Sequence, residues 1–231
     1  MSSLTLSTAC GVVELRQYTL HPGRRDALID LFDREFVETQ EAVGIDLLGQ
    51  FRDLDDADRF VWLRGFTDMA ARGAALPAFY GGPVWAAHRN AANATMVDSD
   101  DVLLLRPAWP DAGLPAVAAR VAQPAGVLLV RVLHLREAPD AELLTLCREA
   151  LVVELKQAGA LQQAWYASEP AANNFPRLPV REGEQVLVAM ALFADAAATW
   201  PAEFDSQVQR WLARPTQALR LAPTTRSSLH A

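Results

Sequence analysis

Alternating and periodic apolar positions divide the first part of the chain into a strand and a helix. The run Val12–Leu20 is rich in residues that favour strands, and Pro22-Gly23 ends it. From about residue 23 to residue 43, apolar residues recur at helical spacing, and Gly44 stands where a glycine commonly ends a helix. The pattern predicts a strand that is followed by an amphipathic helix.

The same analysis predicts two more strands, a helical region and a closing strand. Short apolar runs at Ile45–Phe51 and Phe60–Phe66 flank the acidic turn DLDDAD, which is typical of a hairpin. Asp68 is suited to cap a helical region that extends to about Ala94, and Val102–Arg106 closes the series. The predicted order is β-α-β-β-α-β.

This order of elements occurs a second time along the chain. The stretch GVLLVRVLHL resembles VVELRQYTL and aligns Arg131 with Arg16, an offset of 131 − 16 = 115. The same offset aligns Gly159 with Gly44. The second copy carries an additional polar segment, Asn173–Glu184, which we expect to be a loop that closes a cavity, forms a dimer contact or is a rigid hairpin without a role.

We therefore predict an α+β fold class with two tandem ferredoxin-like (βαββαβ) repeats. A sheet with helices on one side leaves its other face bare, and two such sheets can cover each other in a dimeric α/β-barrel type architecture. The expected units are a first repeat at residues 10–108, a linker at 109–125 and a second repeat at 126–224. The linker contains three prolines.

A polar and aromatic set on two neighbouring strands is the candidate ligand site. Period two places Glu14, Arg16 and Tyr18 on one side of the first strand, and Trp62 and Arg64 lie on the neighbouring strand. The set is too polar for a core beneath helices, so we expect it to face the other sheet and to bind a small aromatic or anionic molecule between the repeats. In the alternative, ion pairs and aromatic rings only fill that space.

The second copy is poorer in such residues. Arg131 corresponds to Arg16, but Leu133 replaces the tyrosine, and Ala189 and Ala191 replace the tryptophan and the second arginine. We therefore expect a site to which the first repeat contributes the polar groups.

His88 and Asn93 are secondary candidates in the segment PVWAAHRNAANATMVDSDDV. A histidine can serve as a general base or an axial haem ligand, but more often it forms a structural hydrogen bond. The sequence shows no orienting carboxylate or nucleophile beside His88, so the catalytic residues stay unknown.

Composition narrows the classes of partner and cofactor. The chain has 28 acidic residues against 21 basic ones, a net charge of −7, which disfavours nucleic acid as a partner. No apolar run is long enough to span a bilayer, and no targeting segment is recognised, so no membrane partner and a cytoplasmic location are expected. Two cysteines and four scattered histidines have no metal-ligand spacing, so we predict neither a metal nor a cofactor.

Several motifs resemble the NIPSNAP family. They are ELRQYTLHPGRRDALIDLF, GIDLLGQF, VWLRGFTDMAAR and WAAHRNAANATMVDSDDVLLLRP in the first copy and NNFPRLPVR in the second. The resemblance implies tandem NIPSNAP-type domains with the dimeric α/β-barrel, ferredoxin-like fold, and a homodimer is a further expectation. It implies no established reaction.

Three functions remain open from the sequence. The first is a protein of uncharacterised activity that binds a small organic ligand. The second, an implication of the wider barrel superfamily, is a cofactor-independent monooxygenase-like or isomerase-like enzyme. The third is a structural or interaction module.

Overall fold

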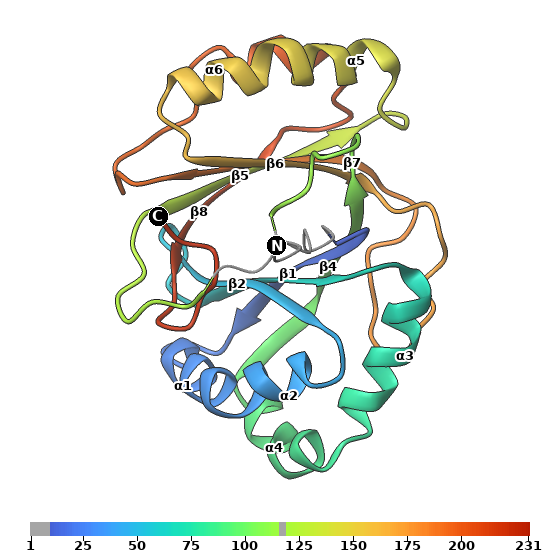
Figure 1. The fold of residues 1–231 in the computed structure, drawn as a ribbon, viewed down its shortest axis with the longest axis vertical. Coiled ribbons are helices and arrows are strands. Elements are labelled where there is room, and N and C mark those ends of the chain that lie inside the picture. Colours follow the sequence, from blue (N-terminus) through green and yellow to red (C-terminus); the bar gives the residue numbers. More distant parts are fainter. Residues whose placement is uncertain (1–9, 116–118) are drawn as a thin grey trace, which may run out of the picture.

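The strands form one closed antiparallel sheet with helices on its outside (Figure 1). The computed structural model describes residues 10–115 and 119–231. Within these residues the strand order around the barrel is β1-β3-β2-β8-β5-β7-β6-β4, and every neighbouring pair is antiparallel. The protein is therefore a mixed α/β barrel without a free sheet edge in the part described.

The elements of the first half follow the predicted order. Its strands are β1 (Val12–Leu20), β2 (Asp46–Asp53), β3 (Arg59–Phe66) and β4 (Met96–Pro107). Its helices are α1 (Arg25–Leu31), α2 (Val37–Glu41), α3 (Met69–Tyr80) and α4 (Pro83–Asn93), and a π-helical turn at Phe32–Phe36 joins α1 to α2.

The second half has a similar series of elements. Its strands are β5 (Val127–Leu135), β6 (Gln162–Ser168), β7 (Gln185–Phe193) and β8 (Gln217–Pro223). Its helices are α5 (Ala141–Leu146), α6 (Val152–Gln157) and α7 (Phe204–Val208), with a π-helical turn at Cys147–Leu151 and a 3₁₀ turn at Gln209–Trp211.

Local signals in the sequence account for several element boundaries. The Asp68 side chain accepts a hydrogen bond from the backbone N–H of Ala71 at 2.8 Å, which confirms it as the cap of α3. Gly44 has a φ of 85°, a left-handed conformation that glycine adopts without strain, and it follows α2 as predicted. The predicted helical region divides at Gly82, where Pro83 begins α4.

The two halves have the same internal strand order. The first half is arranged β4-β1-β3-β2 and the second β8-β5-β7-β6. The π-helical turns begin at Phe32 and Cys147, which differ by the offset that aligns Arg16 with Arg131. Short pairings, β2 with β8 and β4 with β6, join the halves and close the barrel.

The barrel interior is an apolar core, the central cluster. It draws buried side chains from all eight strands, among them Val13, Leu15, Phe51, Val61, Leu63, Leu103, Leu105, Leu128, Val130, Val132, Ala164, Tyr166, Val188, Met190, Leu219 and Leu221. The prediction of a ligand site between the two sheets is wrong. In a closed barrel every second residue of each strand points inward. Here these inward residues are apolar, and their side chains fill the barrel interior.

The polar set therefore lies on the opposite side of its strands. Tyr18 and Trp62 belong to a second core, between the first half of the sheet and helices α1 to α4, together with Phe32, Phe36 and Phe79. Glu14 and Arg16 share this side because they alternate with Val13 and Leu15. The prediction that these residues share one side of two adjacent strands is correct, but that side is the one covered by helices.

None of the helices in residues 10–115 and 119–231 is both long and apolar enough to span a membrane.

Candidate functional site

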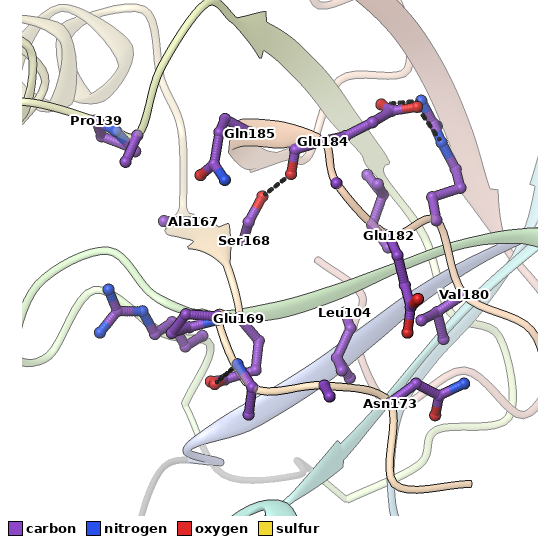
Figure 2. A pocket seen from close by; sticks show the side chains of 18 residues that line it. Leu104, Pro139, Ala167, Ser168, Glu169, Asn173, Val180, Glu182, Glu184 and Gln185 are labelled. Carbon is purple, nitrogen blue, oxygen red and sulfur yellow. Dashed lines mark hydrogen bonds and ion pairs between the residues drawn. The ribbon is translucent and has the colours of Figure 1, made fainter. Parts of the chain in front are cut away.

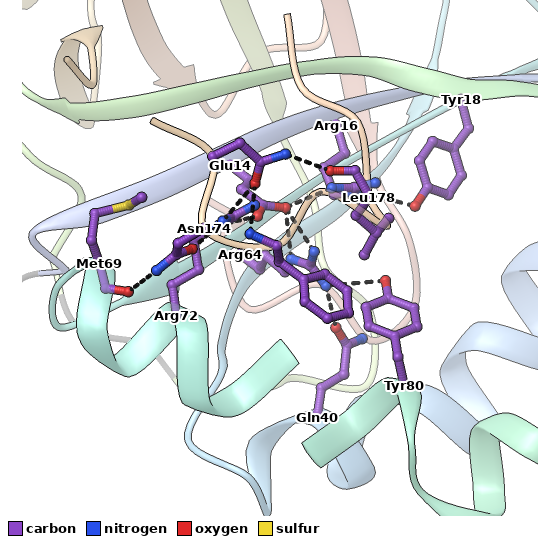
Figure 3. A network of polar contacts seen from close by, with 12 residues as sticks. Glu14, Arg16, Tyr18, Gln40, Arg64, Met69, Arg72, Tyr80, Asn174 and Leu178 are labelled. Atoms are coloured by element: carbon purple, nitrogen blue, oxygen red, sulfur yellow. Dashed lines mark hydrogen bonds and ion pairs between the residues drawn. The ribbon is translucent and has the colours of Figure 1, made fainter. Parts of the chain in front are cut away.

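A buried carboxylate gathers three guanidinium groups beneath the helices of the first half (Figure 3). Glu14 Oε2 accepts hydrogen bonds from Arg16 Nη1 at 2.6 Å and Arg64 Nε at 2.8 Å. Glu14 Oε1 accepts one from Arg72 Nε at 2.7 Å. All four side chains are fully buried, so the contacts are screened little by solvent.

This cluster has more positive than negative charge. Within the described residues, Arg16, Arg64 and Arg72 form ion pairs with Glu14 and with no other carboxylate, so three cations face one anion. Within the described residues, Nη2 of Arg16 and of Arg72 is buried without a hydrogen bond, whereas Arg64 Nη2 lies 2.8 Å from Glu14 Oε2. Buried charges are normally paired, so the excess is a feature that needs a physical explanation.

The ionisation of Glu14 follows from these neighbours. Burial alone would raise the pKa of the Glu14 carboxyl, but the guanidinium groups of Arg64, Arg16 and Arg72 outweigh it and hold that pKa well below its ordinary value. For Arg72, burial lowers the pKa, Glu14 opposes this, and the like charges of Arg64 and Arg16 add to the lowering. The carboxylate is thus firmly ionised.

An indole ring packs against two of the cations. The guanidinium carbons of Arg16 and Arg64 are 5.4 and 5.1 Å from the centre of the Trp62 ring, within the range of cation–π attraction. Tyr18 meets the same indole edge to face at 5.9 Å. Trp62 therefore compensates part of the excess charge without supplying a formal anion.

Two tyrosine hydroxyls connect the cluster to a pocket. Tyr18 Oη accepts a hydrogen bond from Arg16 Nε at 3.1 Å, and Tyr80 Oη accepts one from Arg64 Nη1 at 3.3 Å. Both tyrosines line a cavity of about 190 Å³. Its other walls are Trp85, Asn93, Met96, Ser99, Phe175, Arg177 and Leu178.

A segment of the second half covers this site. The β6–β7 segment, residues 169–184, leaves the second half of the sheet and reaches α3 (Figure 1). It contains the additional polar segment Asn173–Glu184. Arg72 Nη1 donates to Asn173 Oδ1 at 3.0 Å and to Asn174 Oδ1 at 2.6 Å, and Phe175 stacks on Tyr80 with ring centres 5.9 Å apart. Of the roles expected for the additional segment, the geometry corresponds to closing a cavity.

The predicted site residues divide into two groups. Glu14, Arg16, Tyr18, Trp62 and Arg64 are brought together as one network, in which Tyr18 alone reaches the pocket wall. Asn93 also lines the pocket.

His88 lies apart from that network. Its Nε2 is 3.4 Å from Glu35 Oε2, and its side chain is one-third exposed. The sequence pattern did not indicate this carboxylate partner, because Glu35 lies on the π-helical turn before α2.

Sequence reasoning missed Arg72 and Tyr80. Arg72 lies in α3 at helical spacing with Ala75, Leu76 and Phe79, and all four residues are buried. An arginine on the apolar face of a helix could therefore have indicated a buried partner for its charge. Tyr80 is the last residue of α3, and the sequence offered no pattern that would have paired it with Arg64.

The corresponding region of the second half is closed by aromatic rings. Arg131 contacts Asp205 at 3.5 Å and lies over the Trp200 ring at 5.4 Å. Trp165, Trp200 and Phe204 pack together there, with ring centres 4.6 Å apart for the closest pair, Trp200 and Phe204. This side of the barrel thus has one arginine where the first half has three.

A larger cavity of about 480 Å³ lies near the junction of β4 and β6 (Figure 2). Two of its polar side chains are hydrogen-bonded to the backbone. Ser168 Oγ donates to the carbonyl of Glu184 at 2.9 Å and accepts from the N–H of Val186, and Glu169 Oε1 accepts from the N–H of Ala171. We regard the smaller pocket as the candidate site because its wall residues Tyr18 and Tyr80 are hydrogen-bonded to the buried arginine cluster.

Within the residues described, no three metal-ligating side chains converge on a common point.

Comparison with known proteins identifies a family for the first half. Residues 13–109 match the NIPSNAP family model. No curated protein matches the chain in sequence.

Solved structures share the architecture of nearly the whole chain. A candidate monooxygenase from Fusobacterium nucleatum has a TM-score of 0.60 over 94% of each chain at 10% identity. A candidate monooxygenase from Lactobacillus acidophilus has a TM-score of 0.54 over 94% of this chain and 97% of its own, at 13% identity. An anthrone oxidase-like protein has a TM-score of 0.59 over 94% and 93%, at 12% identity. At such identities the likeness is one of fold.

Proposed function

We propose that this protein, whose residues 13–109 match the NIPSNAP family model, binds a small aromatic or anionic organic molecule in the pocket lined by Tyr18 and Tyr80. The observation that carries this proposal is the cluster of three buried guanidinium groups around one carboxylate, directly behind the two phenols. An anion in the pocket would compensate the excess charge.

The pocket walls support an aromatic ligand. Trp85 and Phe175 offer ring faces and edges, and Met96 adds a polarisable side chain. Arg177 stands at the exposed part of the lining, where a cation attracts anions from solution. The cavity is smaller than the usual pocket for a drug-sized molecule, which favours a compact ligand.

The proposal includes the finer architecture. The two halves are ferredoxin-like repeats that arose by internal duplication, with a first repeat at 10–108, a linker at 109–125 and a second repeat at 126–224. Their identical strand order and the matching π-helical turns support this history. Residues 116–118 of the linker lie outside the described residues.

Equilibrium dialysis with a panel of small aromatic acids tests the binding function. We expect at least one benzoate or naphthoate to bind the intact chain more tightly than its methyl ester. The Asn93→Trp variant should lose this binding, because the indole would fill the pocket from α4. Asn90→Trp, an exposed position on the same helix that does not line the pocket, is the matched control.

Either of two results would overturn the proposal. One is that no member of the panel binds at millimolar concentration. The other is that Asn93→Trp binds the ligand as well as Asn90→Trp does.

A second candidate function is a cofactor-independent oxygenase. The paired phenol donors are suited to an oxyanion, and the chain shares its fold with proteins named as candidate monooxygenases. Dioxygen consumption with an enolisable aromatic compound, without added metal or cofactor, would support catalysis. A bound compound that is recovered unchanged, with no dioxygen consumed, would restrict the protein to binding.

A further inference from the structure

The two phenols of the pocket are set to donate hydrogen bonds. A hydroxyl that accepts a hydrogen bond still has its own hydrogen to donate. Tyr18 accepts from Arg16 and Tyr80 accepts from Arg64, and neither donates to an acceptor within the described residues. Burial raises the pKa of Tyr18, although Arg16 opposes this, so its phenol keeps the proton at neutral pH.

The groups behind these phenols make the pocket electropositive. From β1 and β3 come Arg16, Arg64 and the single anion Glu14, and from α3 comes Arg72. A ligand oxygen that accepts a hydrogen bond from Tyr18 would lie within about 6 Å of the Arg16 guanidinium. At this distance, in a buried setting, the Arg16 cation favours an anionic ligand over a neutral one.

The remaining elements around the pocket contribute neither a carboxylate nor an imidazole to its lining. From α4 the lining residues are Trp85 and Asn93, while His88 is directed to Glu35. From β4 they are Met96 and Ser99.

The acidic neighbours of Ser99 in sequence do not line the pocket, and the covering segment adds a cation to it. Asp98 and Asp100, which flank Ser99, line a different depression together with His134 and Arg181. The β6–β7 segment adds the cation Arg177 to the pocket.

We infer that the pocket selects phenols or enols and binds them as their anions, with the oxygen held by Tyr18 and Tyr80. This inference rests on the proposed function and names its ligand class. On binding, the ligand O–H bond breaks, the electron pair stays on oxygen and the proton goes to bulk water, because the lining supplies no base. Arg16 and Arg64 act through the tyrosines as positioning residues.

The cavity favours a small ligand. Its volume of about 190 Å³ lies below the roughly 300–1,000 Å³ of pockets for drug-sized molecules, so a phenol with a single ring is the suitable first probe.

A spectroscopic titration tests whether the bound ligand is ionised. The probe is 4-nitrophenol, which has one ring, titrates near neutral pH and absorbs at different wavelengths as phenol and phenolate. With the intact chain in excess, we expect the titration midpoint of the bound probe to fall by about two units from the free value. Its methyl ether, 4-nitroanisole, cannot ionise and should bind more weakly.

Conservative variants separate the phenol donors from the fold. Tyr18→Phe and Tyr80→Phe should each return the midpoint toward the free value by about one unit, since each removes one donor to a charged acceptor. Tyr166→Phe is the matched control, because Tyr166 is buried in the central cluster, where its hydroxyl accepts from the N–H of Leu114. It should leave the midpoint unchanged.

The possible results distinguish this inference from the function on which it rests. If 4-nitrophenol binds with the same midpoint as in solution, the inference is overturned and the binding function stands. If the midpoint falls equally in all three tyrosine variants, the assignment to Tyr18 and Tyr80 is overturned. If neither probe binds and the aromatic acids fail as well, both proposals fall.

Discussion

Glu14 carries the only negative charge in a buried group with three cations. Replacing it with glutamine keeps the shape of the side chain but leaves the guanidinium groups of Arg16, Arg64 and Arg72 without an anion. Breaking a buried ion pair by removing one partner typically costs about 3–5 kcal/mol. We expect Glu14→Gln to lower the free energy of unfolding by this amount, measured by urea denaturation of the intact chain.

The same substitution should change the response of stability to acid. Because the pKa of Glu14 is depressed in the folded state, its contribution is complete above the unfolded value of about 4.3 and is lost as pH falls toward the folded value. The difference in stability between the native chain and Glu14→Gln should therefore shrink below about pH 4.

An exposed carboxylate provides the control for this measurement. Glu137, which forms no ion pair within the described residues, should tolerate Glu137→Gln within about 0.5 kcal/mol. A loss of less than about 1 kcal/mol for Glu14→Gln would contradict the view that this carboxylate holds the cluster together.

At the scale of elements, α3 and the β6–β7 segment form one contact that depends on a glycine. A Cβ built on Gly73 would lie 2.7 Å from Asn174 Nδ2, so the close approach of the segment requires that no side chain stand there. Asn174 also accepts a hydrogen bond from Arg72 and donates one to the carbonyl of Met69. Gly73 thus permits the close approach of Asn174 to α3, next to Phe175, which lines the pocket.

Gly73→Ala should therefore separate helix stability from ligand binding. Alanine favours a helix over glycine by about 1 kcal/mol, so α3 itself should not be weakened. The displaced Asn174 should lose at least one hydrogen bond, and we expect ligand affinity to fall about tenfold, measured by equilibrium dialysis. Unchanged affinity would show that the segment closes the pocket without this contact.

The sequence predicted the elements well because their signals are local. Apolar spacing indicated β1 and the helix that follows it, Asp68 marked the start of α3, and Gly44 marked the end of α2. These features depend on neighbouring residues and on backbone conformation, both of which can be read from a short stretch of chain.

The face on which the site lies could not be predicted in the same way. Alternation shows which residues share a side of β1, but not which side the helices cover. Polar residues such as Arg16 and Arg64 suggested an open surface, whereas in the structure they pair with Glu14 beneath helices. The hydrogen bond between Arg72 and Asn173 could not be predicted either, because the two residues are 101 positions apart in the sequence.

At the scale of the whole molecule, the barrel is closed only by pairing between the halves. β2 meets β8 through Phe51, Arg52 and Asp53, and β4 meets β6 through its last residues, Leu105 to Pro107. A first half on its own would expose both edges and the apolar face that forms the central cluster.

Residues 1–115 expressed alone should therefore associate. We expect a dimer in which a second copy replaces residues 126–224, because such a copy offers the same strand order and an apolar face. Sedimentation velocity measures this directly. A stable folded monomer of residues 1–115 would contradict this expectation. If the fragment aggregates instead, we attribute the aggregation to its unpaired strand edges, and charged substitutions on β2 should then reduce it.

The β6–β7 segment of the second half covers the pocket of the first half, so the residues that shape part of the pocket wall are distinct from those that close the barrel. Substitutions between Asn173 and Leu178 alter the pocket wall without touching the strand pairings that close the barrel. Over evolutionary time, a gene lineage could therefore acquire new ligand preferences in this short stretch while the rest of the molecule is inherited unchanged. The second half, which has a single arginine in its own corresponding region, would then be the half that diversifies recognition in the first.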